Sequence, residues 1–184
     1  MGISSRSLLH SVTPGGSTVR DYLDQVEACS KVNGLYYLAL GGALAVPDMC
    51  AGLESPTGET SGALYKSWFD VNATPLHRGI LSGEDCYFFR CSFLHQGRTK
   101  HPRGNFTRIV FVEPGAISGM FHMNVMNDAL NIDVGRFCAE MVESARRWLS
   151  RVEGCEPYES NIIHFVQRYP DGLAPYFINV PVIS

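Results

Sequence analysis

Arg90 and His95 are the two residues whose types and spacing point most directly to chemistry. They lie in the run CYFFRCSFLHQG, residues 86–97, with four residues between them. Arginine is a permanent cation that binds phosphate, and histidine titrates near neutral pH, so it can take up or release a proton. The pair can therefore hold a phosphodiester and move a proton on it.

The segment that carries this pair is predicted to be a helix with definite ends. Ser82 and Asp85 fit a capping box at its start, and Gly97 is a stop signal just past His95. At about 100° per residue, apolar side chains surround most of this helix, so it should be buried on most sides. A charged Arg90 there needs an acidic partner, a ligand or an exit to water.

The spacing also limits how the two side chains can meet. On a regular helix they flank the stripe of Tyr87, Cys91 and Leu94 from opposite sides. One helix can bring the two side chains together only if its last turn distorts or if Arg90 reaches round it. Two copies of the chain across a two-fold axis would place both pairs around one cleft more easily. A purely structural alternative stays open, in which His95 interacts with the helix dipole. Arg90 then pairs with an acid, for which the candidates are Asp48, Glu54 and Asp70. Asp48 and Glu54 could also orient His95.

The run from Cys86 to Gly97 resembles the signature helix of HEPN domains, which are small helical domains of toxin–antitoxin, abortive-infection and CRISPR-linked proteins. The motif of that family is an arginine, four to six residues and a histidine, and Arg90 and His95 match it. About a dozen residues carry the resemblance. Two features depart from the family: active members usually have a polar residue directly after the arginine, where this chain has Cys91, and the minimal fold lacks β-strands.

The resemblance implies a homodimeric endoribonuclease that uses no metal ion and no other cofactor. In such an enzyme the ribose 2′-OH attacks the adjacent phosphate, His95 acts as general base or acid, and Arg90 holds the phosphate. It also implies a toxin or phage-defence setting with a cognate antitoxin or another protein partner. The alternative, which Cys91 favours, is a catalytically inactive HEPN-like module that binds RNA, nucleotide or a protein partner. A third possibility is a helical protein unrelated to that family.

A basic segment includes and follows the Arg90 helix. Residues 86–112 contain no Asp or Glu, although the chain as a whole has a formal net charge of −3. The small net charge argues against non-specific coating of nucleic acid. The segment is either a loop that happens to lack acids or one basic face of the protein. In the second case we expect the RNA backbone to run over Arg98, Lys100, His101 and Arg103.

Other chemical motifs are missing from the sequence. The six cysteines show no CxxC or CxH spacing, so no metal site is expected. Free thiols inside apolar runs suit the cytoplasm. Walker A, G-x-G-x-x-G and G-x-S-x-G patterns do not occur. His77 and His122 are expected to be a loop residue and a packed strand residue.

The overall pattern predicts a mainly α fold, with a helical bundle core that is HEPN-like and a small β element in the C-terminal part. Residues 1–17 are expected to be a flexible or disordered N-terminus without a signal peptide. Residues 18–184 are expected to form a single helical domain with a β-containing C-terminal extension from about 105. The longest apolar run, 35–46, is too short to span a bilayer, so no membrane contact is expected.

Individual elements are predicted from their caps and periodicity. Helices are expected from Thr18, over 35–45 with a new turn at Pro47, after Ser61, from Asp133 to about Val152, and over 161–168. Strands are expected over 106–112 and 120–125, paired as a hairpin, and over 177–183.

Overall fold

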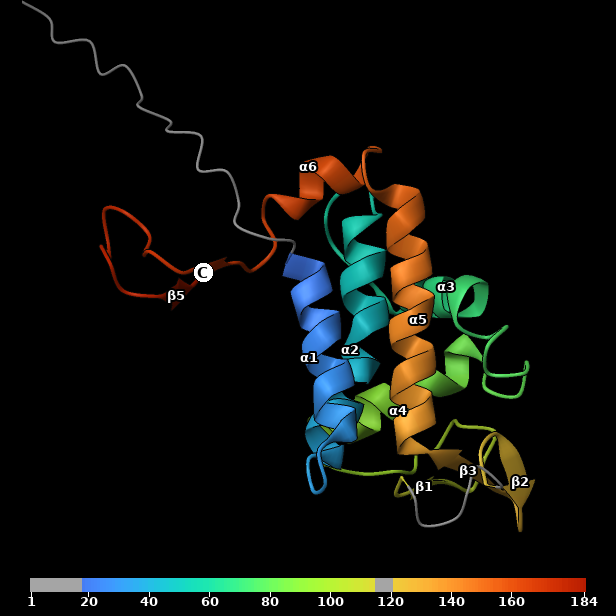
Figure 1. Ribbon diagram of the computed structural model, residues 1–184. Helices are drawn as coiled ribbons and strands as arrows, with labels where there is room; N and C mark the ends of the chain where they lie inside the picture. Colours follow the sequence, from blue (N-terminus) through green and yellow to red (C-terminus); the bar gives the residue numbers. More distant parts are fainter. Residues whose placement is uncertain (1–17, 115–120) are drawn as a thin grey trace, which may run out of the picture.

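The computed structural model describes residues 18–114 and 121–184, and it shows a mainly α fold with a small β part, as the sequence predicted. The expected N-terminal segment, 1–17, lies outside the described residues. The helices are α1 (Thr18–Lys31), α2 (Tyr36–Leu53), α3 (Gly62–Asn72), α4 (Gly83–Gln96), α5 (Val134–Val152) and α6 (Tyr158–Ile162). Figure 1 shows α1, α2 and α5 side by side, with α3 and α4 crossing them and a small sheet at one end.

The core forms where α1, α2 and α5 pack on one another. Asp133 caps α5, since its side chain accepts a hydrogen bond from the backbone N–H of Arg136. Every residue of the apolar face that the sequence predicted for α5 is buried: Phe137, Met141, Val142, Ala145, Trp148 and Leu149. Helix α5 therefore belongs to the bundle, although it follows the point near residue 105 at which the extension was expected to begin.

Helix α2 is longer than the sequence predicted. It runs without a break through Pro47, where a new turn was expected. Proline removes one helical hydrogen bond, but burial of α2 among its neighbours outweighs that loss because most of the surrounding side chains face the core. Among the described residues, α2 is also the one helix long and apolar enough to cross a membrane by length and composition, and 56% of it is buried inside the protein. Buried core helices commonly have the same properties.

The predicted hairpin between 106–112 and 120–125 is wrong. Strand β1 (Arg108–Val112) pairs in parallel with β3 (Ala129–Asp133), and β2 (Asn124–Met126) pairs antiparallel with β3, so β3 lies in the middle. A tight turn joins β2 to β3 through Asn127 and Asp128, both with positive φ. The central strand was overlooked because it runs directly into Asp133, the cap of α5.

The C-terminal part is less regular than predicted. Instead of a helix over 161–168, the chain forms the short helix α6 and then leaves the bundle. The strand expected over 177–183 is also wrong, since only β5 (Val182–Ile183) is paired, with β4 (Arg168–Tyr169). This segment extends away from the helices in Figure 1 and exposes its apolar side chains, among them Tyr176 and Ile178.

Candidate functional site

Helix α4 has the two ends that its sequence predicted. The hydroxyl of Ser82 accepts a hydrogen bond from the backbone N–H of Asp85 at 3.1 Å. Gly97 adopts the left-handed conformation, with φ 61°, and closes the helix through hydrogen bonds from its own N–H and from that of Arg98. The Asp85 carboxylate reaches back to Ser82, whose hydroxyl donates to Oδ2 of Asp85 at 2.8 Å. It also accepts hydrogen bonds from the backbone and side-chain N–H groups of Asn105, which anchors the loop that follows α4.

The start of α4 is fixed by its close approach to α3. A Cβ on Gly83 would lie 2.3 Å from the carbonyl oxygen of Lys66, so only glycine fits between the two backbones. The Lys66 ammonium also pairs with Glu84 at 2.8 Å. These contacts set the orientation of α4 and hence of the Arg90 side chain about two turns further on.

Arg90, His95 and Asp48 form one connected group within a single chain. The Nε of Arg90 donates to Oδ2 of Asp48 at 2.8 Å, and its Nη1 lies 3.2 Å from Nε2 of His95. The long arginine side chain reaches round the helix to make the second contact, which is one of the two routes expected for a single helix. Convergence of the two side chains therefore does not require a second copy.

The charges of this group are partly shielded from water. The side chains of Arg90 and Asp48 are 21% and 17% exposed, whereas His95 is open to solvent. Burial raises the pKa of the Asp48 carboxyl, while the charges of Arg90 and His95 act in the opposite direction. Burial also works against the Arg90 cation, but Asp48 and the Cys91 thiol hold the pKa of Arg90 above its usual value. The site thus has a fixed cation beside an accessible imidazole.

Of the three acids that the sequence offered to Arg90, only Asp48 is used. Glu54 instead accepts a hydrogen bond from Nε1 of Trp148 at 2.8 Å, so the structure brings it to α5 and not to Arg90 or His95. Asp70 accepts from the backbone N–H of Gly83 at 2.6 Å. Cys91 remains close to the group, with its sulfur 3.9 Å from Nη1 of Arg90.

The four basic residues expected to bind RNA fall into two pairs. Arg98 and Lys100 are exposed and directly follow the end of α4. His101 and Arg103 instead cover Phe88. The His101 ring stacks on the Phe88 ring with centres 4.4 Å apart, and the Arg103 guanidinium carbon lies 4.8 Å from the centre of the Phe88 ring. Because Phe88 lies about 10 Å along the helix from His95, the second pair marks the far end of any path over this face.

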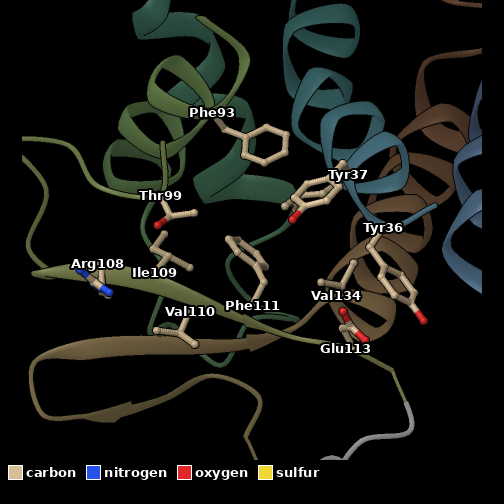
Figure 2. Close-up of a pocket in the computed structure, with 11 residues that line it drawn as sticks. Tyr36, Tyr37, Phe93, Thr99, Arg108, Ile109, Val110, Phe111, Glu113 and Val134 are labelled. Carbon is tan, nitrogen blue, oxygen red and sulfur yellow. The ribbon is translucent and has the colours of Figure 1, made fainter. Parts of the chain in front are cut away.

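Two open hollows lie on this part of the protein, and one of them includes Asp48 in its lining. A groove of about 380 Å³ extends from Asp48 past the turn at Gly58 to Asn161 and His164. A second hollow of about 330 Å³ lies between the start of α2, the end of α4 and β1. Figure 2 shows Phe93, Phe111 and Tyr37 around it, with Arg108 and Glu113 at its rim. Both hollows are large enough to hold part of a nucleotide.

The structure assembles a second polar group that sequence analysis did not find. His77, His122 and Glu140 come from three separate segments and meet inside the protein. Both histidines were expected to be unremarkable loop and strand residues. Their separations along the chain match no metal-binding spacing, so no local pattern announces the cluster, and only the fold brings it together.

Comparisons with known proteins leave the family of this chain open. No protein-family model matches the sequence, and neither the curated proteins nor the solved structures contain a match to it.

Proposed function

We propose that this protein is a metal-independent endoribonuclease of the HEPN type that acts as a homodimer. The observation that carries the proposal is the contact between Nη1 of Arg90 and Nε2 of His95, 3.2 Å apart, with Arg90 held from behind by Asp48. A phosphate-binding cation and a proton carrier at this separation can act on the same phosphodiester.

The contact itself indicates how substrate would activate the site. While Nη1 of Arg90 donates to Nε2 of His95, the lone pair of that nitrogen is occupied. A phosphate group that binds Nη1 takes over this donor, which frees the lone pair of His95 to accept the 2′-OH proton. Bond formation between the 2′-oxygen and phosphorus then expels the 5′-oxygen, which takes up a proton from water while His95 holds the proton of the 2′-OH. The products are a 2′,3′-cyclic phosphate and a 5′-OH end.

Residues around the group supply a path for the rest of the RNA. Arg98 and Lys100 are exposed next to His95 and can bind flanking phosphates. The groove that begins at Asp48 continues the path away from the end of α4. Charge contacts of this kind are sequence-independent, so we expect affinity to fall steeply with salt and cleavage to show little sequence preference.

An apolar surface beside the site supports the homodimer. Tyr37, Leu38 and Leu94 are 79%, 66% and 41% exposed. They form one surface, because Gly41 of α2, one turn after Tyr37 and Leu38, lies against Leu94 of α4. A second copy that covers this Tyr37–Leu38–Leu94 surface would bring two Arg90–His95 groups into one cleft. The toxin or defence setting belongs to the same proposal and rests on the family resemblance.

The test of the nuclease is cleavage of mixed-sequence RNA in EDTA by the native chain and by His95→Ala. We expect the variant to lose cleavage about 100-fold or more, because the step loses its proton carrier. The control is Arg147→Ala, since Arg147 is an exposed residue of α5 that neither belongs to α4 nor lines the groove at Asp48. Equal cleavage by the native chain and His95→Ala, or ends other than cyclic phosphates, would contradict the proposal.

The homodimer has its own test in Leu38→Asp. A charge at the centre of the Tyr37–Leu38–Leu94 surface should turn a dimer into a monomer, as measured by analytical ultracentrifugation, without unfolding the chain. Val71→Asp is the control, because Val71 is similarly exposed but lies on α3. A native chain that is monomeric at high micromolar concentration would contradict the dimer.

The aromatic hollow of Figure 2 favours the alternative function, a module that binds RNA or nucleotide without cleaving it. Aromatic rings stack on any base, and Arg108 at the rim can bind its phosphate. In that case the native chain binds RNA but leaves it intact. Arg108→Ala then weakens binding by roughly tenfold, while Arg147→Ala, which removes an exposed arginine of α5, does not. Fluorescence anisotropy with labelled RNA measures both.

A further inference from the structure

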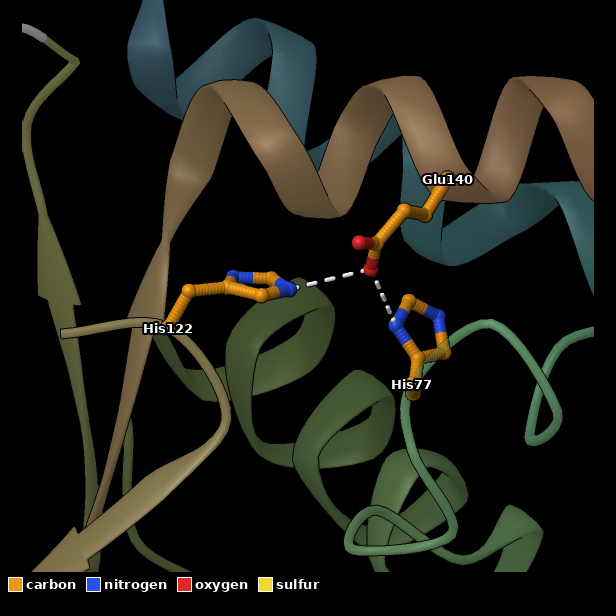
Figure 3. A group of neighbouring side chains, drawn as sticks. All are labelled: His77, His122 and Glu140. Carbon is orange, nitrogen blue, oxygen red and sulfur yellow. Dashed lines mark hydrogen bonds and ion pairs between the residues drawn. The ribbon is translucent and has the colours of Figure 1, made fainter. Parts of the chain in front are cut away.

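His77, His122 and Glu140 meet in a buried cluster formed by three distant segments (Figure 3). His77 lies in the turn between α3 and α4, His122 in the turn before β2, and Glu140 in the second turn of α5. Nδ1 of His77 and Nε2 of His122 lie 2.8 Å and 3.0 Å from the same carboxylate oxygen, Oε2 of Glu140. All three potential ligand atoms lie within 4.8 Å of one another.

The cluster is not readily explained as ordinary core packing. The two histidine side chains are 0% and 2% exposed, yet their outer nitrogens, Nε2 of His77 and Nδ1 of His122, have no hydrogen-bond partner among the described residues. Buried polar atoms without a partner cost free energy, and an apolar trio of the same size would avoid that cost. Two imidazoles that share a single carboxylate oxygen therefore suggest a ligand between them.

The surrounding side chains hold the rings in place for such a ligand. The His77 ring is sandwiched between Phe69 and Phe137, with ring centres 5.4 Å and 5.3 Å away and nearly parallel planes. This packing fixes the direction of Nδ1 toward Glu140. Oε2 of Glu140 can only accept, so each inner nitrogen donates its proton to it in the metal-free chain. A metal ion that replaces these two hydrogen bonds would leave the proton of each ring on its outer nitrogen, which has no partner among the described residues to oppose that tautomer.

We propose that His77, His122 and Glu140 bind a divalent transition-metal ion, with Zn²⁺ as the best match. Two imidazole nitrogens and one carboxylate oxygen form a ligand set that Zn²⁺ takes in proteins. Bonds of about 2.0–2.2 Å place neighbouring ligand atoms of a tetrahedral site roughly 3.3–3.5 Å apart. The observed 2.8 Å and 3.0 Å need to open by roughly 0.3–0.7 Å, and the two imidazole nitrogens, which lie within 4.8 Å of each other, need to close toward the same separation.

The remaining coordination position can be filled from solvent. The Glu140 side chain is 24% exposed, whereas both histidines are buried, so the carboxylate marks the side from which an ion and a water molecule enter. A bound ion would join the α3–α4 turn, the segment before β2 and α5, which are far apart along the chain. It should therefore stabilise the folded state, because the unfolded chain cannot offer the same three ligands together.

The experiment is a Zn²⁺ titration of the full chain after removal of bound metal, with calorimetry for stoichiometry and circular dichroism for Tm. We expect one ion per chain and a Tm rise of about 5–10 °C when Zn²⁺ is at 100 times its dissociation constant. His122→Gln and Glu140→Gln should each lower the affinity by at least ~100-fold. The controls, His164→Gln and Cys155→Ser, remove exposed ligand types elsewhere and should bind as the native chain does.

A spectroscopic measurement on the native chain keeps the proposal testable even if a core variant fails to fold. Zinc-edge X-ray absorption should show nitrogen and oxygen neighbours with the scattering pattern of two imidazoles, and no sulfur. The proposal would be overturned by sulfur neighbours around the zinc, by binding of more than one Zn²⁺ ion per chain, or by a folded Glu140→Gln variant that binds Zn²⁺ as tightly as the native chain. The outcome of the Zn²⁺ experiments is independent of the nuclease proposal, because cleavage is measured in EDTA and is tested through Arg90 and His95 of α4.

Discussion

Arg90→Ala should lower RNA cleavage by about 100–1,000-fold, which is the usual loss when a donor aimed at the reacting phosphate is removed. The guanidinium makes two directed contacts at once, through Nε to Asp48 and through Nη1 to His95. Arg90→Lys should lose nearly as much, because an ammonium cannot reproduce this planar arrangement of donors. The measurement is the single-turnover rate in EDTA, with Arg147→Ala as an exposed arginine control.

A double variant separates a joint catalytic role from two independent ones. If Arg90 and His95 act on one phosphodiester, Arg90→Ala combined with His95→Ala should cleave no more slowly than the poorer single variant. Arg90→Ala also leaves the Asp48 carboxylate without its cation, so Arg90→Ala with Asp48→Asn serves as the check on folding. Strictly multiplicative losses, or full activity in Arg90→Lys, would show that Arg90 contributes only a general positive charge.

Local sequence patterns were enough to locate the Arg90 helix, but not to choose its partner. Ser82 and Gly97 mark its ends by rules that depend on neighbouring residues alone, and the structure confirms both. Asp48 was one of three acids offered to Arg90, because composition shows that a buried cation needs an acid but not which one. The choice is made by the packing of α2 against α4, since it brings Asp48 within reach and leaves Glu54 at Trp148.

Features that depend on contacts between distant segments were not predicted. The parallel pairing of β1 with β3 skips the strand between them, and the sequence of β1 does not state which neighbour it will take. The cluster of His77, His122 and Glu140 is of the same kind. Taken alone, His77 reads as a loop residue and His122 as a packed strand residue. Their convergence follows only from where the α3–α4 turn and the segment before β2 meet α5.

Trp148→Ala should destabilise the fold by roughly 3–5 kcal/mol, the usual cost of removing a fully buried aromatic side chain. Trp148 is 1% exposed and packs edge-on against Trp68 and Tyr158, with ring centres 6.0 Å and 5.9 Å away. Its loss leaves a cavity where α5 meets α3 and α6. Tm should fall by roughly 6–20 °C, measured by circular dichroism because the substitution itself alters fluorescence.

Two further variants divide this loss between packing and hydrogen bonding. Trp148→Phe retains most of the ring but removes the N–H that Glu54 accepts from, so the carboxylate loses its buried donor. Glu54→Gln keeps an acceptor at the same place and should cost much less than Trp148→Phe. Tyr176→Ala, an aromatic residue 77% exposed, should shift stability by no more than about 0.5 kcal/mol. A Trp148→Ala variant as stable as Tyr176→Ala would mean that α5 does not pack on α3 and α6 in solution as described. The hydrogen bond from Trp148 to Glu54 would then not form either.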